Sequence, residues 1–337
     1  MKKLLFPLLL VLLMAGCHSS EDPSKAFKDL ELLQSMPSAQ FNWLQKGNWV
    51  FNQGDSICAQ TFVQPEVFGP CEGTVPNLFA YSNYLTSPTG DTVLIWNSST
   101  TLDPYCHVLD LRNAPDVIYL GKFQPNGVYS SCAGIHNGYM YATKDAHFLG
   151  VYDLSLLDPQ NAILEADMEV GAVSLDEINF THVAAFQDTF AYVGGNGNPI
   201  YVLSIADPIR PRVLSALKVQ SSNGLTVYDG HLYNRGNASI DILSLSDPAH
   251  PLPVARIDEI HAKDMKWRDR YLYAVSESSL YIYDIGTPAS PVLVRRINVP
   301  GELLLKIWLF GDYLMAASIA DVGFVSNKRL YFYPNVP

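Results

Sequence analysis

Six polar residues of this chain could form one ligand site if the chain folds as a ring of repeated units. Five of them fall at the same place, within one residue, when the segments are aligned on the turn and the Tyr that follow them. These residues are Ser131, His182, Asn223, Lys263 and Lys306, and Asp264 is adjacent. Paired ammonium groups suit an anionic ligand, so Lys263, Asp264 and Lys306 would carry a site for a small ligand or an ion. The alternative is a solvated channel lining.

Catalytic and cofactor-binding motifs are missing from the sequence. It contains no Gly-x-Ser-x-Gly elbow and no His-x-His or His-Glu-x-x-His pair, which are spacings that nucleophilic and zinc catalysis use. Gly194–Gly197 is better explained as a hairpin loop than as a phosphate-binding loop, because no helix pattern follows it. We therefore name no catalytic residue, and we expect no metal and no cofactor.

A phrase that recurs about every 40 residues indicates how the polar residues are positioned. It consists of an apolar-alternating strand, Asp or Ser, an aliphatic residue, a short turn and usually Pro-x-x-Pro. Its anchor residues, spaced by 43, 51, 40 and 40 positions, are Asp110, Asp153, Ser204, Ser244 and Asp284. A period of this length is typical of β-propeller blades. Residues that repeat in every unit usually have structural roles, since each unit solves the same folding problem.

Short strand patterns between the phrases predict an all-β propeller of four-stranded blades over residues 41–337. The five phrases and one last unit predict six blades, with seven as the alternative. That last unit has three strand patterns, namely Leu303–Leu309, Tyr313–Ala317 and Arg329–Tyr333. A strand from the N-terminal region, with Asn48–Phe51 as the candidate, would complete it and close the ring. The 51-residue spacing places a loop insertion at Glu169–Asn179, which is either a recognition loop or neutral surface variation.

The segment Leu280–Ile285 (LYIYDI), followed by Pro-x-x-Pro, resembles the LVIVD repeat of bacterial and archaeal exported β-propeller proteins. The resemblance covers residues 105–318, whereas residues 41–104 and 319–337 diverge. Ser204 and Ser244 depart from the pattern because they replace the motif Asp. The resemblance implies a propeller fold. It implies little about activity, because most members are lipoproteins or secreted proteins without an assigned function.

The first 40 residues predict export and a lipid anchor. Lys2 and Lys3 precede an 11-residue apolar run, Leu4–Met14, which is too short to span a bilayer comfortably. The phrase LMAGC resembles a bacterial lipobox, so residues 1–16 would be a signal peptide and Cys17 the lipidated (palmitate-bearing) first residue. Residues 17–40 would form a tether with one short helix at Ala26–Ser35. By resemblance to the enteric sorting rule, His18 favours the outer membrane over the inner membrane.

Four other cysteines are available for disulfides in an exported chain, namely Cys58, Cys71, Cys106 and Cys132. Four cysteines allow three connectivities. We favour Cys58–Cys71, because these residues bracket one 12-residue segment, and Cys106–Cys132 would then link consecutive blades. A zinc site is the competing interpretation, and the absence of Cys-x-x-Cys spacing disfavours it.

The charge and composition leave two classes of function. A net charge of −11 disfavours nucleic acid as a partner, because phosphate binding needs a basic face. The leading hypothesis is a non-enzymatic envelope lipoprotein, a scaffold that binds a protein or glycan partner and is attached to the membrane by its lipid. The alternative is a propeller enzyme, a hydrolase or lyase that acts on envelope polymers with the polar channel residues.

Overall fold

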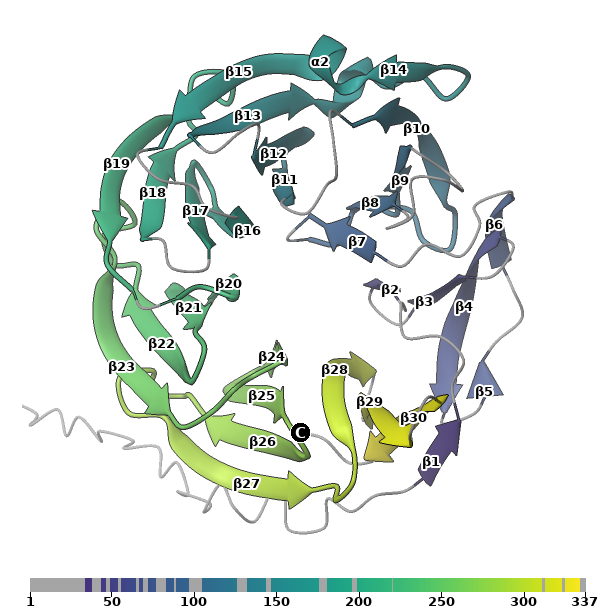
Figure 1. Cartoon of the computed structure of the whole chain (residues 1–337), viewed down its shortest axis with the longest axis vertical. Coiled ribbons are helices and arrows are strands. Elements are labelled where there is room, and N and C mark those ends of the chain that lie inside the picture. Colours follow the sequence, from purple (N-terminus) through teal and green to yellow (C-terminus); the bar gives the residue numbers. More distant parts are fainter. Residues whose placement is uncertain are drawn as a thin grey trace, which may run out of the picture.

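In a computed structural model the strands form a ring of sheets around a central opening (Figure 1). The structure describes residues 34–37, 44–46, 49–53, 56–64, 67–68, 72–76, 83–87, 89–96, 105–125, 132–143, 147–175, 181–195, 199–219, 221–310, 313–322 and 325–333. For some of these strands, including all those before residue 87, only the backbone is described. The architecture confirms the predicted all-β propeller.

The described strands form seven sheets, which we number as blades in chain order. Blade one comprises β2 (Leu44–Lys46), β3 (Trp49–Gln53), β4 (Ser56–Gln64), β5 (Val67–Phe68) and β6 (Glu72–Pro76). Blade two comprises β7 (Asn83–Thr86), β8 (Thr92–Trp96), β9 (Cys106–Asp110), β10 (Ile118–Gln124) and the added strand β14 (Ala162–Leu164). Blade three comprises β11 (Cys132–His136), β12 (Tyr139–Thr143), β13 (Phe148–Asp153) and β15 (Glu169–Ser174).

Blades four to seven follow with four strands each. Blade four comprises β16 (Thr181–Gln187), β17 (Phe190–Gly195), β18 (Ile200–Ser204) and β19 (Arg212–Leu217). Blade five comprises β20 (Gly224–Tyr228), β21 (His231–Arg235), β22 (Ser239–Ser244) and β23 (Leu252–Asp258). Blade six comprises β24 (Asp264–Arg268), β25 (Tyr271–Ser276), β26 (Ser279–Asp284) and β27 (Val292–Asn298). Blade seven comprises β28 (Leu303–Phe310), β29 (Tyr313–Val322), β30 (Val325–Tyr333) and β1 (Gln34–Pro37).

The seven sheets of the described strands are one more than the six blades that the repeated phrases predict, and seven was the alternative. The additional sheet is blade one, built from residues 44–76. This segment contains no copy of the repeated phrase, so counting the phrases does not detect this blade. Its antiparallel register is nevertheless regular, with Trp49 opposite Thr61 on β4.

The ring closes by an N-terminal strand, but the expected strand was wrong. Strand β1 pairs antiparallel with β30, with Gln34 opposite Phe332 and Pro37 opposite Arg329. The candidate Asn48–Phe51 lies instead in and next to β3 of blade one. The end of the expected helix Ala26–Ser35 is also strand, because β1 begins at Gln34, and the rest of that helix lies outside the described residues. The segment expected as a tether therefore contributes to a sheet.

The insertion that lengthens the spacing between Asp153 and Ser204 to 51 residues lies earlier in the chain than Glu169–Asn179, where the sequence predicted it. In blades four to six, seven residues separate the third strand from the outermost strand, whereas β13 and β15 are separated by Leu154–Met168. This longer connection forms a 3-10 helix (Leu154–Leu156), strand β14 and the short helix α2 (Glu165–Met168). Strand β14 runs parallel to β10, with Lys122 opposite Ala162, so the insertion adds a strand to the outer edge of blade two.

Hydrophobic side chains between neighbouring blades form the core. In one cluster, Tyr233 and Ile242 of blade five pack with Met265 and Leu272 of blade six. A tyrosine recurs two residues after the start of the second strand in blades three to six, and all four side chains are fully buried: Tyr141, Tyr192, Tyr233 and Tyr273. Burial raises the pKa of each of these phenols, because it penalises the phenolate.

The repeated Asp or Ser of the phrase holds the turn that follows the third strand. Its side chain accepts the backbone N–H two residues ahead, at 2.9 Å for Asp110, 2.8 Å for Asp153, 3.3 Å for Ser244 and 2.9 Å for Asp284. This is an Asx or ST turn, which Asp and Ser both form. The Ser residues that depart from the repeat pattern therefore retain this hydrogen-bonding role, as Ser244 shows.

Two of these Asp residues also pair with arginine. The Arg270 guanidinium donates to both oxygens of Asp284, at 2.9 and 2.5 Å, and Arg112 makes the corresponding contacts with Asp110. Burial of Asp110 acts to raise its pKa, but the hydrogen bonds and charge of Arg112 outweigh burial and place that pKa below its ordinary value. These carboxylates are buried ion-pair partners with a structural role.

We predict that residues 34–37 stabilise the whole ring. Deleting residues 18–40 should lower the melting temperature by at least about 5 °C, because blade seven loses a strand and its edge is exposed. Deleting residues 18–33, which leaves β1 in place, is the matched control and should change the melting temperature little. Thermal unfolding followed by circular dichroism measures both. Equal melting of the two truncations and the full chain would show that β1 does not secure the ring.

We also predict that Ser partly replaces Asp at the repeated position. Asp284→Ala should lower the free energy of unfolding by about 2 kcal/mol, because the N–H of Gly286 and the Arg270 guanidinium both lose their acceptor. Asp284→Ser should cost about half as much, since the hydroxyl still accepts the turn N–H. Urea unfolding measures both variants, with Arg270→Ala as the control that removes the ion pair alone. Equal losses for Ala and Ser would reject the turn as the main role.

Candidate functional site

The structure places the described members of the predicted set on the innermost strands of their blades or one residue before them. The strand registers put Asn223 and Lys263 at matching positions, each with its backbone N–H donated to the end of the second strand, at Arg235 and Val275 respectively. Lys306 lies opposite Ala317, and Asp264 lies opposite Val275, so these two residues occupy equivalent positions of their strands. This position is one residue after that of Lys263. Ser131 and the side chain of His182 lie outside the described residues, so their place in the cluster stays a prediction.

Arg235 joins this cluster and was missed from the sequence. It ends β21 directly opposite Gly224, and its guanidinium Nη2 donates to the backbone oxygen of Asn223. A Cβ at Gly224 would lie 2.7 Å from the Arg235 Nε, so the absence of a side chain there makes room for the guanidinium. A glycine at the start of an inner strand, with Arg on the facing strand, is the signal that could have identified it.

Arg235 is a half-buried cation of the cluster. Burial lowers the pKa of its guanidinium, and the charge of Asp264 acts in the opposite direction. An arginine remains protonated even so, which means that a positive charge is held in a poorly solvated place. Such a charge is costly unless it is paired.

Asp264 connects two neighbouring blades beside this charge. Its Oδ2 accepts the backbone N–H of Ile307 on β28 at 3.1 Å, so the carboxylate of blade six is fixed against blade seven. Lys263 precedes Asp264 in the chain and is exposed, and Lys306 precedes Ile307 and is half-buried. The Asp264 carboxylate thus lies against the strand that carries Lys306, and Lys263 is its neighbour in the chain. A ligand site formed by these three residues stays a prediction. We call these three residues with Asn223 and Arg235 the channel cluster.

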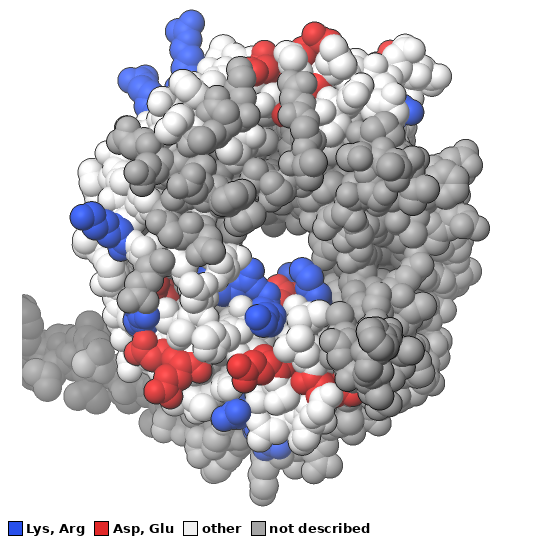
Figure 2. Space-filling view, in the orientation of Figure 1, with Lys and Arg blue, Asp and Glu red and all other residues white. Residues whose placement is uncertain are grey.

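Basic side chains gather at the central opening on this face. Figure 2 shows basic side chains at the rim of the central opening, in the sector where Figure 1 places β20, β24 and β28, with acidic side chains further out. Exposed acidic residues lie at the outer connections of this sector, including Asp258, Glu259 and Glu277. The channel cluster is therefore a local positive site in a chain whose net charge is −11.

A second feature lies at the other end of the blades, where the Pro-x-x-Pro turns lead into the outermost strands. Large aliphatic side chains are exposed within the first three residues of three successive outermost strands, β19, β23 and β27. They are Val213 (41% exposed), Leu214 (42%), Leu252 (61%), Val292 (56%) and Leu293 (48%). We call these five residues the apolar band. Exposed apolar side chains that adjoin one another are typical of interaction surfaces.

A bulge at the same place in each of these strands explains why the band is regular. The register with the third strand shifts between Val202 and Leu203, between Ile242 and Leu243, and between Ile282 and Tyr283. A bulge twists and bends its strand. Because it recurs at one position, the first residues of all three outermost strands present their side chains in the same way.

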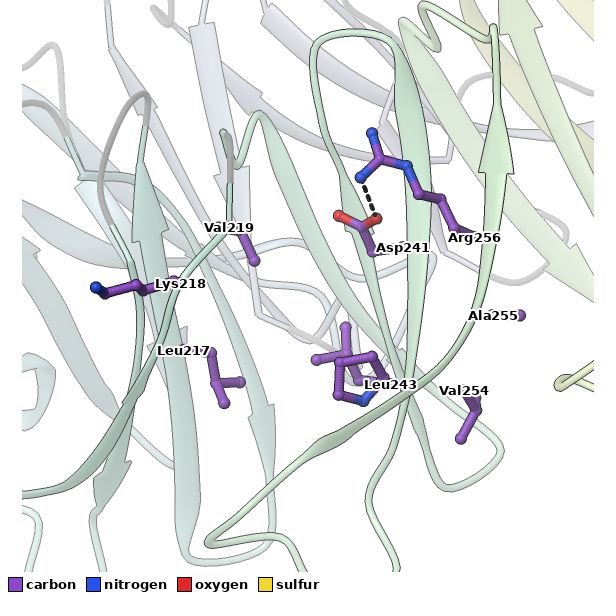
Figure 3. Close-up of a pocket in the computed structure, with 9 residues that line it drawn as sticks. Leu217, Lys218, Val219, Asp241, Leu243, Val254, Ala255 and Arg256 are labelled. Carbon is purple, nitrogen blue, oxygen red and sulfur yellow. Dashed lines mark ion pairs between the residues drawn. The ribbon is translucent and has the colours of Figure 1, made fainter.

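A groove of about 560 Å³ lies between blades four and five next to this band. Leu217 from β19, Leu243 from β22 and Val254 from β23 line its apolar part (Figure 3). At its other end the Arg256 Nη1 lies 3.5 Å from the Asp241 Oδ1, an ion pair drawn in the same view. Pro253 also lines the groove and directly follows Leu252, so the groove and the apolar band are continuous.

The cysteine predictions fall partly outside the described residues. Cys106 is buried in β9 and packs in the same cluster as Ala142, the β12 residue opposite Cys132. Cys58 lies in β4 opposite Thr74 of β6, and β6 begins one residue after Cys71. The side chains of Cys58 and Cys132 and all of Cys71 are outside the description, as are Cys17 and residues 1–16. The pairing and the lipidation stay predictions.

Metal ligands and membrane-spanning helices were sought over the same part of the chain. The described residues contain no group of three or more His, Cys, Asp or Glu side chains placed to hold a metal ion. Of the helices in the described residues, none has the length and apolar character needed to cross a membrane.

Comparison with known proteins bears on the fold. No protein-family model matches the chain, and no curated protein matches it in sequence. Among solved structures, BamB from Moraxella catarrhalis superposes with a TM-score of 0.51 at 9% identity, over 90% of this chain and 97% of that chain. The chain shares the β-propeller fold of BamB. At this identity the likeness shows the architecture alone, so function must be argued from the two surfaces described above.

Proposed function

We propose that this chain is a non-enzymatic scaffold of the bacterial cell envelope that binds a protein partner along the apolar band. The observation that carries the proposal is the exposure of aliphatic residues within the first three residues of three successive outermost strands. A rigid ring with a repeated edge presents an extended surface in the way that repeat proteins do. The adjoining groove between blades four and five offers a pocket for an anchoring side chain.

The chemistry of the band favours a protein over a glycan. Its five residues are all aliphatic, and aliphatic side chains offer no aromatic face on which a sugar ring stacks. The outermost strands β19, β23 and β27 also end the described sheets of their blades, so their edges can pair with an extended segment of another chain. Blade two already carries such an added strand, because β14 of the same chain pairs with β10.

The envelope location rests on the N-terminal sequence. A charged start, an 11-residue apolar run and the Ala15-Gly16-Cys17 sequence support an exported protein whose mature chain begins at a lipidated Cys17. A lipid at Cys17 would tether the ring to a bilayer through residues 18–33, which precede β1. We assign the outer membrane as its destination because His18, and not Asp, follows the cysteine.

We predict that the apolar band contacts a protein in cells. A photo-crosslinking amino acid at Leu252 or Val292 should give a protease-sensitive adduct of defined mass in cells that naturally make the protein. The double variant Leu214→Lys with Leu293→Lys should reduce that adduct at least about fivefold, since it places charge within the contact. Immunoblotting of the crosslinked envelopes measures the yield.

Two controls make this result specific. Leu156→Lys makes the same chemical change at a residue that is 48% exposed but outside the band, and it should leave the yield unchanged. The crosslinker at Glu277, on the turn between β25 and β26, tests the other end of the blades. An equal yield from Glu277, or no protein adduct from Leu252 and Val292, would reject the band as the partner surface.

We predict that Cys17→Ser moves the protein from the membrane fraction to the soluble periplasmic fraction. The Cys17 sulfur is the atom to which the lipid would be attached, so replacing it with the serine oxygen abolishes anchoring. Ser20→Ala is the matched control and should remain with the membrane, and His18→Asp should shift the protein toward the inner membrane. Fractionation with immunoblotting measures each variant. Continued membrane association of Cys17→Ser would contradict the lipid anchor.

A further inference from the structure

The channel cluster contains more positive than negative charge. Three of its residues are cationic, Arg235, Lys263 and Lys306, whereas Asp264 is its carboxylate. Glu302, a further carboxylate, precedes β28, and its Oε2 accepts the Ser318 hydroxyl at 2.6 Å on the second strand of blade seven. The five residues of the cluster together carry a surplus of two formal positive charges.

The arginine of this cluster has donor capacity that the protein does not use. A guanidinium has five N–H donors, and within the described part of the chain Arg235 donates from Nη2 to the Asn223 oxygen. Asn223 is itself held in place, because its Nδ2 donates to the Asn237 Oδ1 at 2.8 Å. The guanidinium is thus oriented by the fixed backbone carbonyl of Asn223. An oxyanion could accept hydrogen bonds from its other N–H groups.

We propose that the mouth of the central channel binds a phosphate group, which Arg235, Lys263 and Lys306 hold together. A guanidinium binds two oxygens of one oxyanion in a fixed geometry, and ammonium groups add charge without a fixed direction. A phosphate group has at least three oxygens that can each face one of the three cations, whereas a carboxylate has two. Low-dielectric walls and a positive opening also concentrate anions there, in contrast to the acidic outer surface.

The phosphate can be free or part of a larger molecule, such as a phosphorylated sugar. Asp264 would tune the site in either case, because it lies next to Lys263 in the chain and against blade seven through Ile307. Its negative charge opposes the binding of an anion. We therefore expect that removing the two lysine charges weakens anion binding and that removing the Asp264 charge strengthens it.

Isothermal titration of the mature soluble chain tests the proposal, with inorganic phosphate and glucose 6-phosphate as probes at low ionic strength. Lys263→Gln combined with Lys306→Gln should weaken phosphate binding about tenfold or more. Asp264→Asn, which can still accept the Ile307 N–H, should tighten it severalfold. Lys218→Gln, on the outer groove between blades, removes the same charge elsewhere and should leave binding unchanged.

The two probes separate the sources of the phosphate. Equal affinities indicate a site for free phosphate, and tighter binding of glucose 6-phosphate, with none of glucose, indicates a phosphorylated saccharide. Arg235→Lys keeps the charge and removes the fork, so it should weaken binding in a chain whose melting temperature shows that it is folded. No binding of either probe by the unmodified chain would overturn the proposal. Unchanged affinity in the double lysine variant, or weaker binding by Asp264→Asn, would also overturn it.

Discussion

One hydrogen-bonded junction recurs in blades two to six, and the geometry of the apolar band depends on it. The residue after the repeated Asp or Ser donates its backbone N–H to a carbonyl in the turn between the first two strands. Examples are Leu111 to Asp91 at 2.7 Å, Leu245 to Gly230 at 2.9 Å and Ile285 to Arg270 at 2.8 Å. Each of these blades thereby fixes the end of its third strand against its first hairpin, and in blades four to six the Pro-x-x-Pro turn begins at the same place.

Neighbouring blades reinforce this junction. The Tyr192 hydroxyl of blade four donates to the Pro248 oxygen in the turn of blade five at 3.1 Å, and the Ser215 hydroxyl donates to the Ala249 oxygen at 2.8 Å. These bonds hold a turn that would otherwise project into solvent. Because the core lies between blades, a blade is incomplete alone, and its turn is positioned by the blade before it as well as by its own Asp or Ser.

The sequence could predict what the repeats determine and little of what departs from them. The period, the Asx turns and the need for an N-terminal strand all follow from residues such as Asp284 and Pro288, so the propeller and the mode of closure could be inferred. Blade one could not be counted, because residues 44–76 form a sheet without the phrase. The first residues of the strand Gln34–Pro37 were predicted as the end of an amphipathic helix. A strand of four residues has too short a hydrophobic pattern to indicate its conformation. Pairing with β30 decides its conformation.

The same limit applies to the channel cluster. Lys263 and Lys306 could be aligned to within one residue because each precedes the first hairpin turn of its blade at nearly the same distance, which places them on or next to inner strands. Arg235 ends a second strand, a position at which the other blades carry apolar or small residues such as Val275, so no repetition pointed to it. Its role becomes visible only where Gly224 lies opposite and leaves space for the guanidinium.

The two surfaces occupy opposite ends of the blades, which separates their chemistry. Asn223 and Arg235 lie where β20 starts and β21 ends, whereas Leu252 follows the turn that the junction at Gly230 holds at the opposite end. A charged ligand in the channel would therefore not contact a protein on the outer edge. Any coupling between them would have to pass along the strands of one blade, such as the hydrogen-bonded ladder of β20 to β23. The ring is thus suited to holding two ligands at once and independently, as a scaffold requires.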